Sequence, residues 1–223
     1  MEITNQNSFS GALGCCILAF LFFMLLTSGI SFFFHIPPNY IIPPLSLILA
    51  IGFTYIFSGR GKLLLPTILS SVFFIFFFAI LCSLIYDSTY DSYGYHYDAV
   101  IMMAKGWDPV YETPWNECLW NQHYAKGLEI MQSAIFGLTG NLQSTKCVNF
   151  LFVISAISLT WYALGIVFPS LSRWWKAAIV FITTANPIVI CQLTTAYNDY
   201  MLWIETVLLI CCFLMIWETS RKV

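Results

Sequence analysis

Charged residues are scarce in this sequence. Its 223 residues include 9 Lys and Arg and 11 Asp and Glu, so charged side chains make up only 9% of the chain. A soluble domain carries roughly 25% charged residues, which solvate its surface. Hydrophobic residues make up 59% of this chain. We therefore expect lipid to be the solvent for most of it.

Runs of basic residues are also missing. The net charge is -2, and no cluster of Lys and Arg forms a stripe that could follow a phosphate backbone. This composition argues against a nucleic-acid partner. Residues 1–10 contain no Lys or Arg, so they lack the positive region of a secretory signal peptide. We interpret the first apolar segment, residues 12–34, as a retained helix.

The cysteines show neither the pairing pattern of a disulfide framework nor the spacing of a metal site. Of the 8 cysteines, only Cys118 lies well inside a polar segment. The others lie in or beside apolar segments, where cysteine acts as a small core residue.

The hydropathy pattern predicts an all-α, polytopic membrane protein with about six transmembrane helices, because a span needs about 20 apolar residues. The predicted spans are residues 12–34, 41–58, 63–86, 145–168, 176–195 and 199–217. The second is short and begins near Pro43 and Pro44. Pro187 lies within the fifth span and should kink it, which leaves a carbonyl group near Thr183 without its helical partner.

Basic residues between these spans predict the orientation, because Lys and Arg concentrate in short cytoplasmic loops. With six spans, three basic pairs fall on one side: Arg60 and Lys62, Arg173 and Lys176, Arg221 and Lys222. We therefore expect both termini to be cytoplasmic. We expect a single module over residues 1–223 in a membrane such as the bacterial inner (plasma) membrane, with the long loop 87–144 on the outer side.

The predicted outer loop carries most of the chemistry. Residues 87–144 hold seven of the 11 acidic residues and many aromatic side chains. Residues 95–105, closed by Gly106 and Pro109, and residues 124–136 are predicted amphipathic helices. Such helices typically lie along a membrane surface.

Two acids follow the third predicted span directly. A carboxylate at Asp91 could meet the head group of a lipid held between helices, and partial burial would raise its pKa toward that of a general base. The alternative is that Asp91 caps the helix predicted over residues 95–105. Asp87 is close enough to replace Asp91, and His96 lies in the same segment.

Further candidates lie later in the chain. Lys126 and Glu129 are three residues apart, so they form a solvated ion pair, or else Lys126 or His123 binds a phosphate. Asp199 opens the sixth predicted span, either as a turn residue or as a second carboxylate facing the loop. Glu205 lies within that span and should face protein, because a charge facing lipid is costly.

Together these segments resemble GT-C-type membrane glycosyltransferases, in particular bacterial members similar to protein O-mannosyltransferases and lipid A aminoarabinose transferases. The resemblance covers residues 60–217. The segments that carry it are Tyr90–Ser92 with Tyr95–His96 and Lys105–Pro109, then His123–Gly127, and finally Thr194–Asp199.

The resemblance also implies roles for individual residues. Asp91 matches the acid that acts as catalytic base, and Asp199 matches the second acid. The residues that match the donor-binding and phosphate-binding region are His96, His123, Tyr124 and Lys126. A divalent cation held by Asp91 and Asp199 is the alternative to Lys126 for stabilising the donor phosphate.

The implied reaction moves a sugar from a polyprenyl-phosphate lipid to an acceptor hydroxyl or amine at the outer membrane face. Members of the family are longer than this chain. The sequence is thus expected to be a fragment, a shortened member, or one part of a module that a partner chain completes. The alternatives to an enzyme are a non-catalytic membrane subunit and a transporter-like protein that binds lipid or solute.

Overall fold

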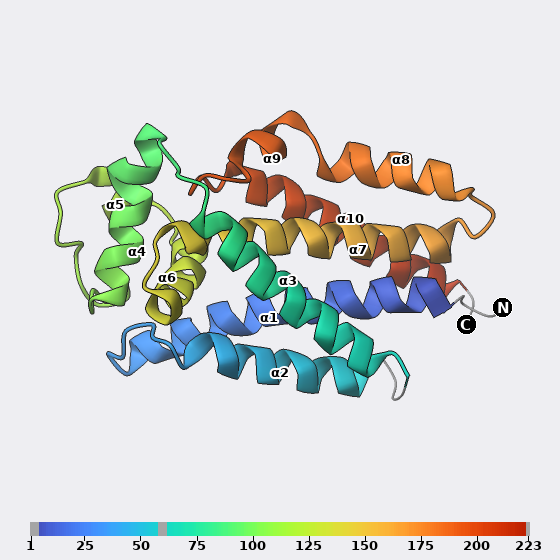
Figure 1. Cartoon of the computed structure of the whole chain (residues 1–223), viewed down its shortest axis with the longest axis horizontal. Helices are drawn as coiled ribbons and strands as arrows, with labels where there is room; N and C mark the ends of the chain where they lie inside the picture. Colours follow the sequence, from blue (N-terminus) through green and yellow to red (C-terminus); the bar gives the residue numbers. More distant parts are fainter. Residues whose placement is uncertain (1–4, 58–61, 222–223) are drawn as a thin grey trace.

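The computed structural model describes residues 5–57 and 62–221, and the regular elements within these ranges are all helices. The long helices run side by side along the longest axis of the molecule, with alternating direction (Figure 1). They are α1 (Asn5–Phe33), α2 (Ile42–Phe57), α3 (Leu64–Ser83), α7 (Cys147–Val167), α8 (Arg173–Thr184) and α10 (Asp199–Ser220).

Four of the described helical segments are long and apolar enough to cross a membrane: Phe9–Phe33, Leu64–Ser83, Gln143–Val167 and Asp199–Ser220. The chain is therefore a membrane protein, as the composition indicates. In contrast, α2 has 16 residues and α8 has 12, fewer than the second and fifth predicted spans. Both still lie within the bundle of long helices (Figure 1).

The fifth predicted span is broken rather than kinked. α8 ends at Thr184, and a separate short helix, α9 (Pro187–Gln192), follows. Proline disfavours a helical conformation in the residue before it, and Asn186 is extended with ψ 161°. Its side chain then caps α9 by accepting a hydrogen bond from Val189 N–H at 3.0 Å. As predicted, the carbonyl of Thr183 needs another partner, and the Trp203 indole donates to it at 2.7 Å.

Small residues let α1 and α7 approach closely. A Cβ atom added at Gly14 would lie 2.7 Å from Cγ of Leu159, and one added at Gly11 would lie 2.8 Å from the Tyr162 ring. The Gly14 carbonyl also accepts a hydrogen bond from the Ser155 hydroxyl at 3.0 Å. Close backbone approach at small residues is the usual way in which helices pack in lipid, where dispersion contacts replace the hydrophobic effect.

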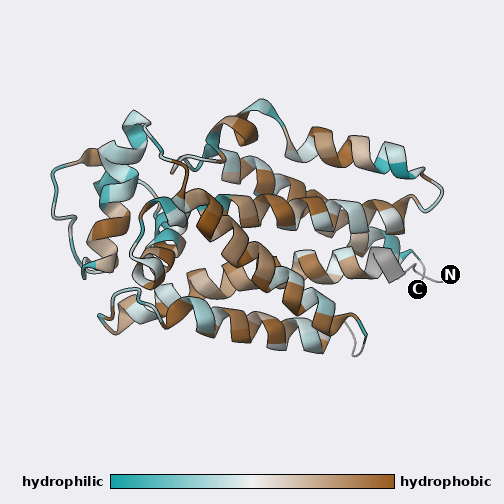
Figure 2. Cartoon of the chain, viewed as in Figure 1, coloured by the Kyte–Doolittle hydropathy of each residue, from teal (hydrophilic) through white to brown (hydrophobic). Residues whose placement is uncertain are grey.

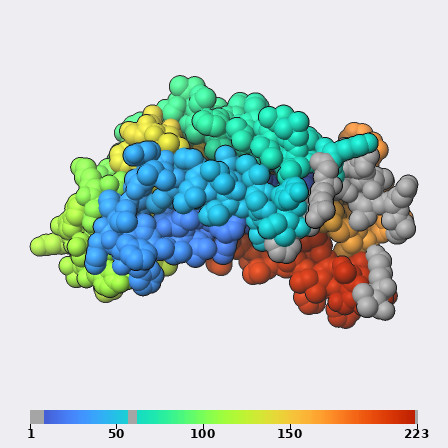
Figure 3. All heavy atoms as spheres, turned by 90° about the horizontal axis from the view of Figure 1, so that it is seen from below, coloured from blue at the N-terminus to red at the C-terminus, as the bar shows by residue number. Residues whose placement is uncertain are grey.

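The polar part of the chain gathers at one end of the bundle (Figure 2). It consists of a π-helical turn η1 (Ser92–His96), α4 (Tyr97–Ala104), α5 (Leu119–His123), α6 (Gly127–Thr139) and the 3-10 turn η2 (Gln143–Lys146). α4 runs across the direction of the long helices (Figure 1), and the loop residues form a cap over this end in the space-filling view (Figure 3). The two helices predicted in the loop are thus confirmed, with somewhat shifted bounds.

The predicted end of the first loop helix is also confirmed. Gly106 adopts a φ of +113°, which an L side chain rarely tolerates. Trp107 N–H then bonds back to the Met102 carbonyl at 2.9 Å, as in a Schellman-type helix end. Trp107 is thereby buried against Phe32 and Met103, which fastens this turn to the end of α1.

The end of α2, the start of α3, the start of α8 and the C-terminal end of α10 lie together at the end opposite the polar cap (Figure 1). This is the arrangement on which the predicted orientation depends. Arg60 and Lys222, two of the basic residues used for that prediction, lie outside the described residues.

Candidate functional site at the polar end of the bundle

Asp87 is buried, with 2% of its surface exposed, and its carboxylate is occupied by protein donors. It accepts hydrogen bonds from Thr89 N–H at 2.9 Å, from the Thr89 hydroxyl at 2.7 Å, from the Tyr97 hydroxyl at 3.2 Å and from Ala196 N–H at 2.9 Å. Burial alone would raise the pKa of Asp87, but hydrogen bonds from Ser92, Thr89 and Ala196 outweigh it and lower the pKa. Asp87 is therefore suited to holding the chain in place rather than to accepting a proton.

A second layer of polar residues supports Asp87. Its backbone N–H donates to Gln143 Oε1 at 3.0 Å, and the same oxygen accepts a hydrogen bond from Lys146 Nζ at 2.7 Å. Lys146, fully buried at the start of α7, also donates to the Ile85 carbonyl. These contacts tie the segment after α3 to η2, as burial of polar groups requires.

Asn149 holds the segment between α9 and α10 in place through buried hydrogen bonds. Its amide donates to the Thr195 carbonyl at 2.7 Å, and its oxygen accepts a hydrogen bond from the Tyr200 hydroxyl at 2.9 Å. The sequence pattern does not point to Asn149. The only available signal was a lone amide inside an apolar span, which in lipid must find a partner.

Asp91 contrasts with Asp87. It is partly buried at the start of η1, and its carboxylate makes no hydrogen bond or ion pair with the described residues. The capping role considered for Asp91 is wrong, because α4 begins only at Tyr97 and the preceding turn is π-helical, without a side-chain cap. Single π-helical turns are rare and frequently occur at functional sites.

Tyr95 lies among several acidic side chains. Burial raises the pKa of its phenol to about 12, with further contributions from the negative charges of Asp91, Asp199 and Glu129 and from Tyr124. The charges of these three acids therefore act on one hydroxyl group. Asp91 and Asp199, 108 positions apart in the numbering, thus both contribute to the raised pKa of this phenol.

His96 and Glu129 form a buried hydrogen-bonded pair. His96 Nδ1 lies 2.7 Å from Glu129 Oε1, and both side chains are 1% exposed. The other carboxylate oxygen, Glu129 Oε2, has no hydrogen-bond partner within the described part of the chain. The interpretation of Lys126 and Glu129 as a solvated ion pair is therefore wrong, because Glu129 is buried with His96 as its partner.

Lys126 is also largely buried, with 9% exposure. Its ammonium donates to the Trp120 carbonyl at 3.0 Å. Burial lowers the pKa of Lys126, although the charge of Glu129 opposes this shift. The ammonium is thus a partly desolvated positive charge with two further donor positions, the kind of group that binds an anion strongly.

Asp199 lies exposed in the first turn of α10 and accepts a hydrogen bond from Gln192 Nε2 at 2.9 Å. Glu205, further along the same helix, is exposed on the bundle surface. The expectation that Glu205 faces protein is therefore wrong for this chain by itself. α10 packs mainly on α7, and this leaves the face with Glu205 uncovered.

A cavity of about 430 Å³ lies between residues 107–114 and residues 121–126. His123, Tyr124 and Lys126 line it, so three of the predicted phosphate-region residues share one space. The Tyr124 ring also lies 6.1 Å from the Tyr95 ring and 4.9 Å from the Trp120 ring. Tyr124 therefore connects the cavity to the acids around Tyr95.

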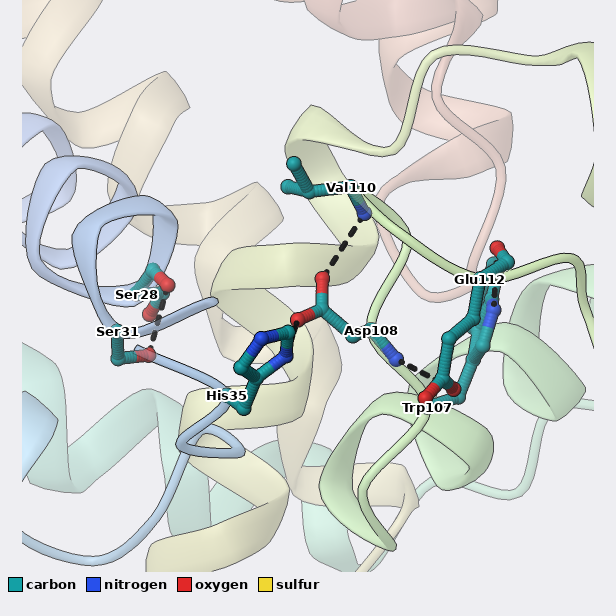
Figure 4. A network of polar contacts seen from close by, with 7 residues as sticks. All are labelled: Ser28, Ser31, His35, Trp107, Asp108, Val110 and Glu112. Atoms are coloured by element: carbon teal, nitrogen blue, oxygen red, sulfur yellow. Dashed lines mark hydrogen bonds and ion pairs between the residues drawn. The ribbon is translucent and has the colours of Figure 1, made fainter. Parts of the chain in front are cut away.

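An ion pair holds one wall of this cavity to the bundle. His35 Nδ1 lies 3.1 Å from Asp108 Oδ2, and the other Asp108 oxygen accepts a hydrogen bond from Val110 N–H at 3.0 Å (Figure 4). Next to them, the Trp107 indole donates to the Glu112 carbonyl at 3.2 Å. His35 takes a φ of +55° and its ring lies 4.9 Å from the Tyr111 ring. These contacts fix residues 107–112.

A second cavity is apolar. It measures about 360 Å³ and lies among α7, α8 and α9, where the break at Pro187 separates the two short helices. Val153, Trp161, Val180, Phe181 and Leu193 are among its lining residues. Leu193 directly follows Gln192, the partner of Asp199, so the cavity ends near the polar cap.

Asp91 and Asp199 could hold a cation only together with ligands from water or from a substrate. Among residues 5–57 and 62–221, no three His, Cys, Asp or Glu side chains gather as a metal site. Asp91 and Asp199 offer carboxylate oxygens, which hard divalent cations prefer, but such ions take about six ligands. Asp91 and Asp199 would supply only two carboxylate groups, so most ligands of such an ion would have to come from water and from the phosphate of a substrate.

Comparison with known proteins adds no relative: no protein-family model, curated protein or solved structure matches this chain.

Proposed function

We propose that this membrane protein is a glycosyltransferase that moves a sugar from a polyprenyl-phosphate lipid to an acceptor hydroxyl or amine. The observation that carries the proposal is the contrast between Asp91 and the polar residues around it. Asp87, His96 and Glu129 are held in internal contacts, whereas the Asp91 carboxylate is unpaired within the described residues beside Tyr95. An unpaired acid in a rigid polar setting is a candidate general base.

In the proposed reaction, the acceptor oxygen or nitrogen attacks the anomeric carbon of the donor sugar. The acceptor proton passes to the Asp91 carboxylate while the new bond forms. The bond between the anomeric carbon and the phosphate oxygen breaks, and its electron pair leaves with the polyprenyl phosphate. Attack opposite the leaving group inverts the configuration at the anomeric carbon.

Lys126 would stabilise the leaving phosphate. Its ammonium is nearly buried and lies in the cavity that Tyr124 connects to Tyr95. A positive charge in a poorly solvated site stabilises developing negative charge more strongly than one in water. A divalent cation bound by Asp91 and Asp199 would supply Lewis-acid stabilisation of the same phosphate when present.

The apolar cavity among α7, α8 and α9 offers a place for part of the lipid chain. Its walls are almost entirely hydrocarbon, and it ends beside the Gln192–Asp199 contact. We place the polar cap on the outer side of a bacterial inner membrane, with about six spans and both termini in the cytoplasm, on the basis of the basic residues at the opposite end.

One observation favours a second candidate, a subunit of a larger membrane assembly. Glu205 is exposed on α10, six residues beyond Asp199, and so about 9 Å further along the helix. A carboxylate facing lipid at that depth is costly, and a further transmembrane helix with a donor group would remove this cost.

The experiment that tests the proposal is transfer of labelled sugar in membranes that contain either the natural chain or Asp91→Asn at equal expression. Loss of transfer in the variant supports the enzyme. No transfer by the natural chain with any polyprenyl-phosphate donor favours the subunit.

A further inference from the structure

Aromatic rings and planar polar groups together line the cavity between residues 107–114 and 121–126. Aromatic rings come from Trp107, Tyr111 and Tyr124, and planar polar groups come from Glu112, Asn121 and Gln122. Ligand sites of this size are typically built from apolar walls and a few placed polar groups. The volume of about 430 Å³ lies within the range of small-molecule sites and is large enough for a sugar ring.

The charge of the cavity does not fit a simple anion. Glu112 supplies one negative charge and Lys126 one positive charge, and the other polar walls are amides, hydroxyls and one imidazole. A site built for phosphate alone would gather positive charge and leave out a carboxylate. Here both donors and acceptors line the same space.

Asn121 provides an independent sign of an absent partner. It is 3% exposed, and its amide nitrogen donates to Asn116 at 3.3 Å. Its Oδ1, in contrast, accepts no hydrogen bond within the described residues. Buried polar atoms nearly always have a partner, and this oxygen is itself buried, so a bound water or a small shift of a neighbouring donor is needed to satisfy it.

We propose that this cavity binds a carbohydrate ring. Aromatic faces pack against the C–H face of a sugar, and planar carboxylate and amide groups exchange hydrogen bonds with its hydroxyls. The inference deepens the proposed function and rests on it for the source of the sugar. That source is either the donor, whose phosphate would then reach Lys126, or the acceptor.

Saturation-transfer NMR on the full chain in detergent tests the proposal without requiring turnover. The probes are methyl glycosides of common hexoses and N-acetylhexosamines, with inorganic phosphate as the competing anion. We expect saturable, weak binding to the natural chain. Glu112→Gln and Gln122→Leu should each weaken it roughly tenfold, the effect of losing one well-placed hydrogen bond.

Glu117→Gln is the matched control, since Glu117 is also an exposed acid of the same loop but does not line the cavity. Binding should be unchanged in this variant. Competition by a polyprenyl-phosphate sugar assigns the site to the donor, and binding that persists beside that lipid assigns it to the acceptor.

Two results would overturn the proposal: no glycoside binds, or the glycoside signal is displaced by phosphate and unaffected by Glu112→Gln and Gln122→Leu. Both can be told apart from failure of the proposed function. If the chain transfers sugar but binds no glycoside, only the proposed sugar subsite fails. If it binds glycosides but transfers no sugar, only the proposed enzyme function fails.

Discussion

Asp87 accepts a hydrogen bond from the backbone N–H of Ala196, 109 residues further along the chain, at 2.9 Å. This contact joins the segment after α3 to the segment before α10. Asp91 lies four residues after Asp87, and Asp199 opens α10 three residues after Ala196, so this contact fixes the positions from which both acids act on Tyr95.

Replacing Asp87 should therefore affect stability. Asp87→Ala leaves the N–H groups of Thr89 and Ala196 without their buried acceptor, which costs about 2–4 kcal/mol. The melting temperature in detergent should fall by roughly 5–10 °C. Asp91→Ala is the matched control, and it should leave the melting temperature nearly unchanged because Asp91 accepts no hydrogen bond within the described residues. Equal losses in both variants would contradict the distinction between the two acids.

The pH dependence of stability follows from the same contacts. The folded pKa of Asp87 is lowered, so its stabilising effect is present above the unfolded value of about 3.9 and is lost as pH falls through the folded pKa. Melting temperatures measured from about pH 5 down to about pH 2 should fall less steeply for Asp87→Asn than for the natural chain. Parallel curves would show that protonation of the Asp87 carboxylate does not contribute to the pH dependence of stability.

Replacing Lys126 should lower activity without lowering stability, the reverse of the effect expected for Asp87. Burial penalises its charge, so Lys126→Met should keep or raise the melting temperature. Transfer should fall by about 10²–10³-fold, the range expected when one group that stabilises developing charge is removed. Lys105→Met, an exposed lysine of the same polar cap, serves as control. A variant at Lys126 that unfolds but transfers normally when stabilised by lipid would show a structural role.

The His96–Glu129 pair should be strongly coupled. Removing one partner leaves a buried, uncompensated group, so His96→Leu and Glu129→Leu should each be costly. The double variant should cost less than their sum by about 1–3 kcal/mol, measured as a thermal-stability cycle. The same cycle at His35 and Asp108, where the imidazole is 69% exposed, should give less than about 1 kcal/mol. Additive losses at His96 and Glu129 would mean that the pair contributes no mutual stabilisation.

The predicted orientation can be tested at Cys118. Its thiol is partly exposed in the polar cap, whereas the two exposed cysteines, Cys15 and Cys191, lie on apolar helices. A membrane-impermeant maleimide added to intact spheroplasts should label the natural chain, and Cys118→Ser should abolish that labelling. Labelling only after the membrane is opened would place the polar cap in the cytoplasm.

The sequence predicts best where structure depends on neighbouring residues. Gly106 closes the loop helix at the predicted place because only a positive φ allows the turn. Pro187 frees the carbonyl of Thr183 as predicted, since proline removes a helical donor. The full break into α8 and α9 was not predicted, because it depends on the capping side chain of Asn186.

Contacts between distant segments could not be predicted. His96 and Glu129 are 33 residues apart, and nothing in the sequence distinguishes a buried pair from two exposed charged residues. The sequence likewise does not distinguish the roles of Asp87 and Asp91, because both residues follow the same helix. Only the fold shows that one carboxylate is occupied by Thr89, Tyr97 and Ala196 and the other is unpaired within the described residues.

The decisive measurement is transfer of radiolabelled sugar from polyprenyl-phosphate donors, in membranes with equal amounts of the natural chain, Asp91→Asn or Asp87→Asn. We expect transfer by the natural chain and loss of at least about 10³-fold in Asp91→Asn without a change in melting temperature, because a general base and its charge are both removed. Asp87→Asn should retain transfer in proportion to the folded protein. Full activity in Asp91→Asn would contradict the role of this carboxylate as the base.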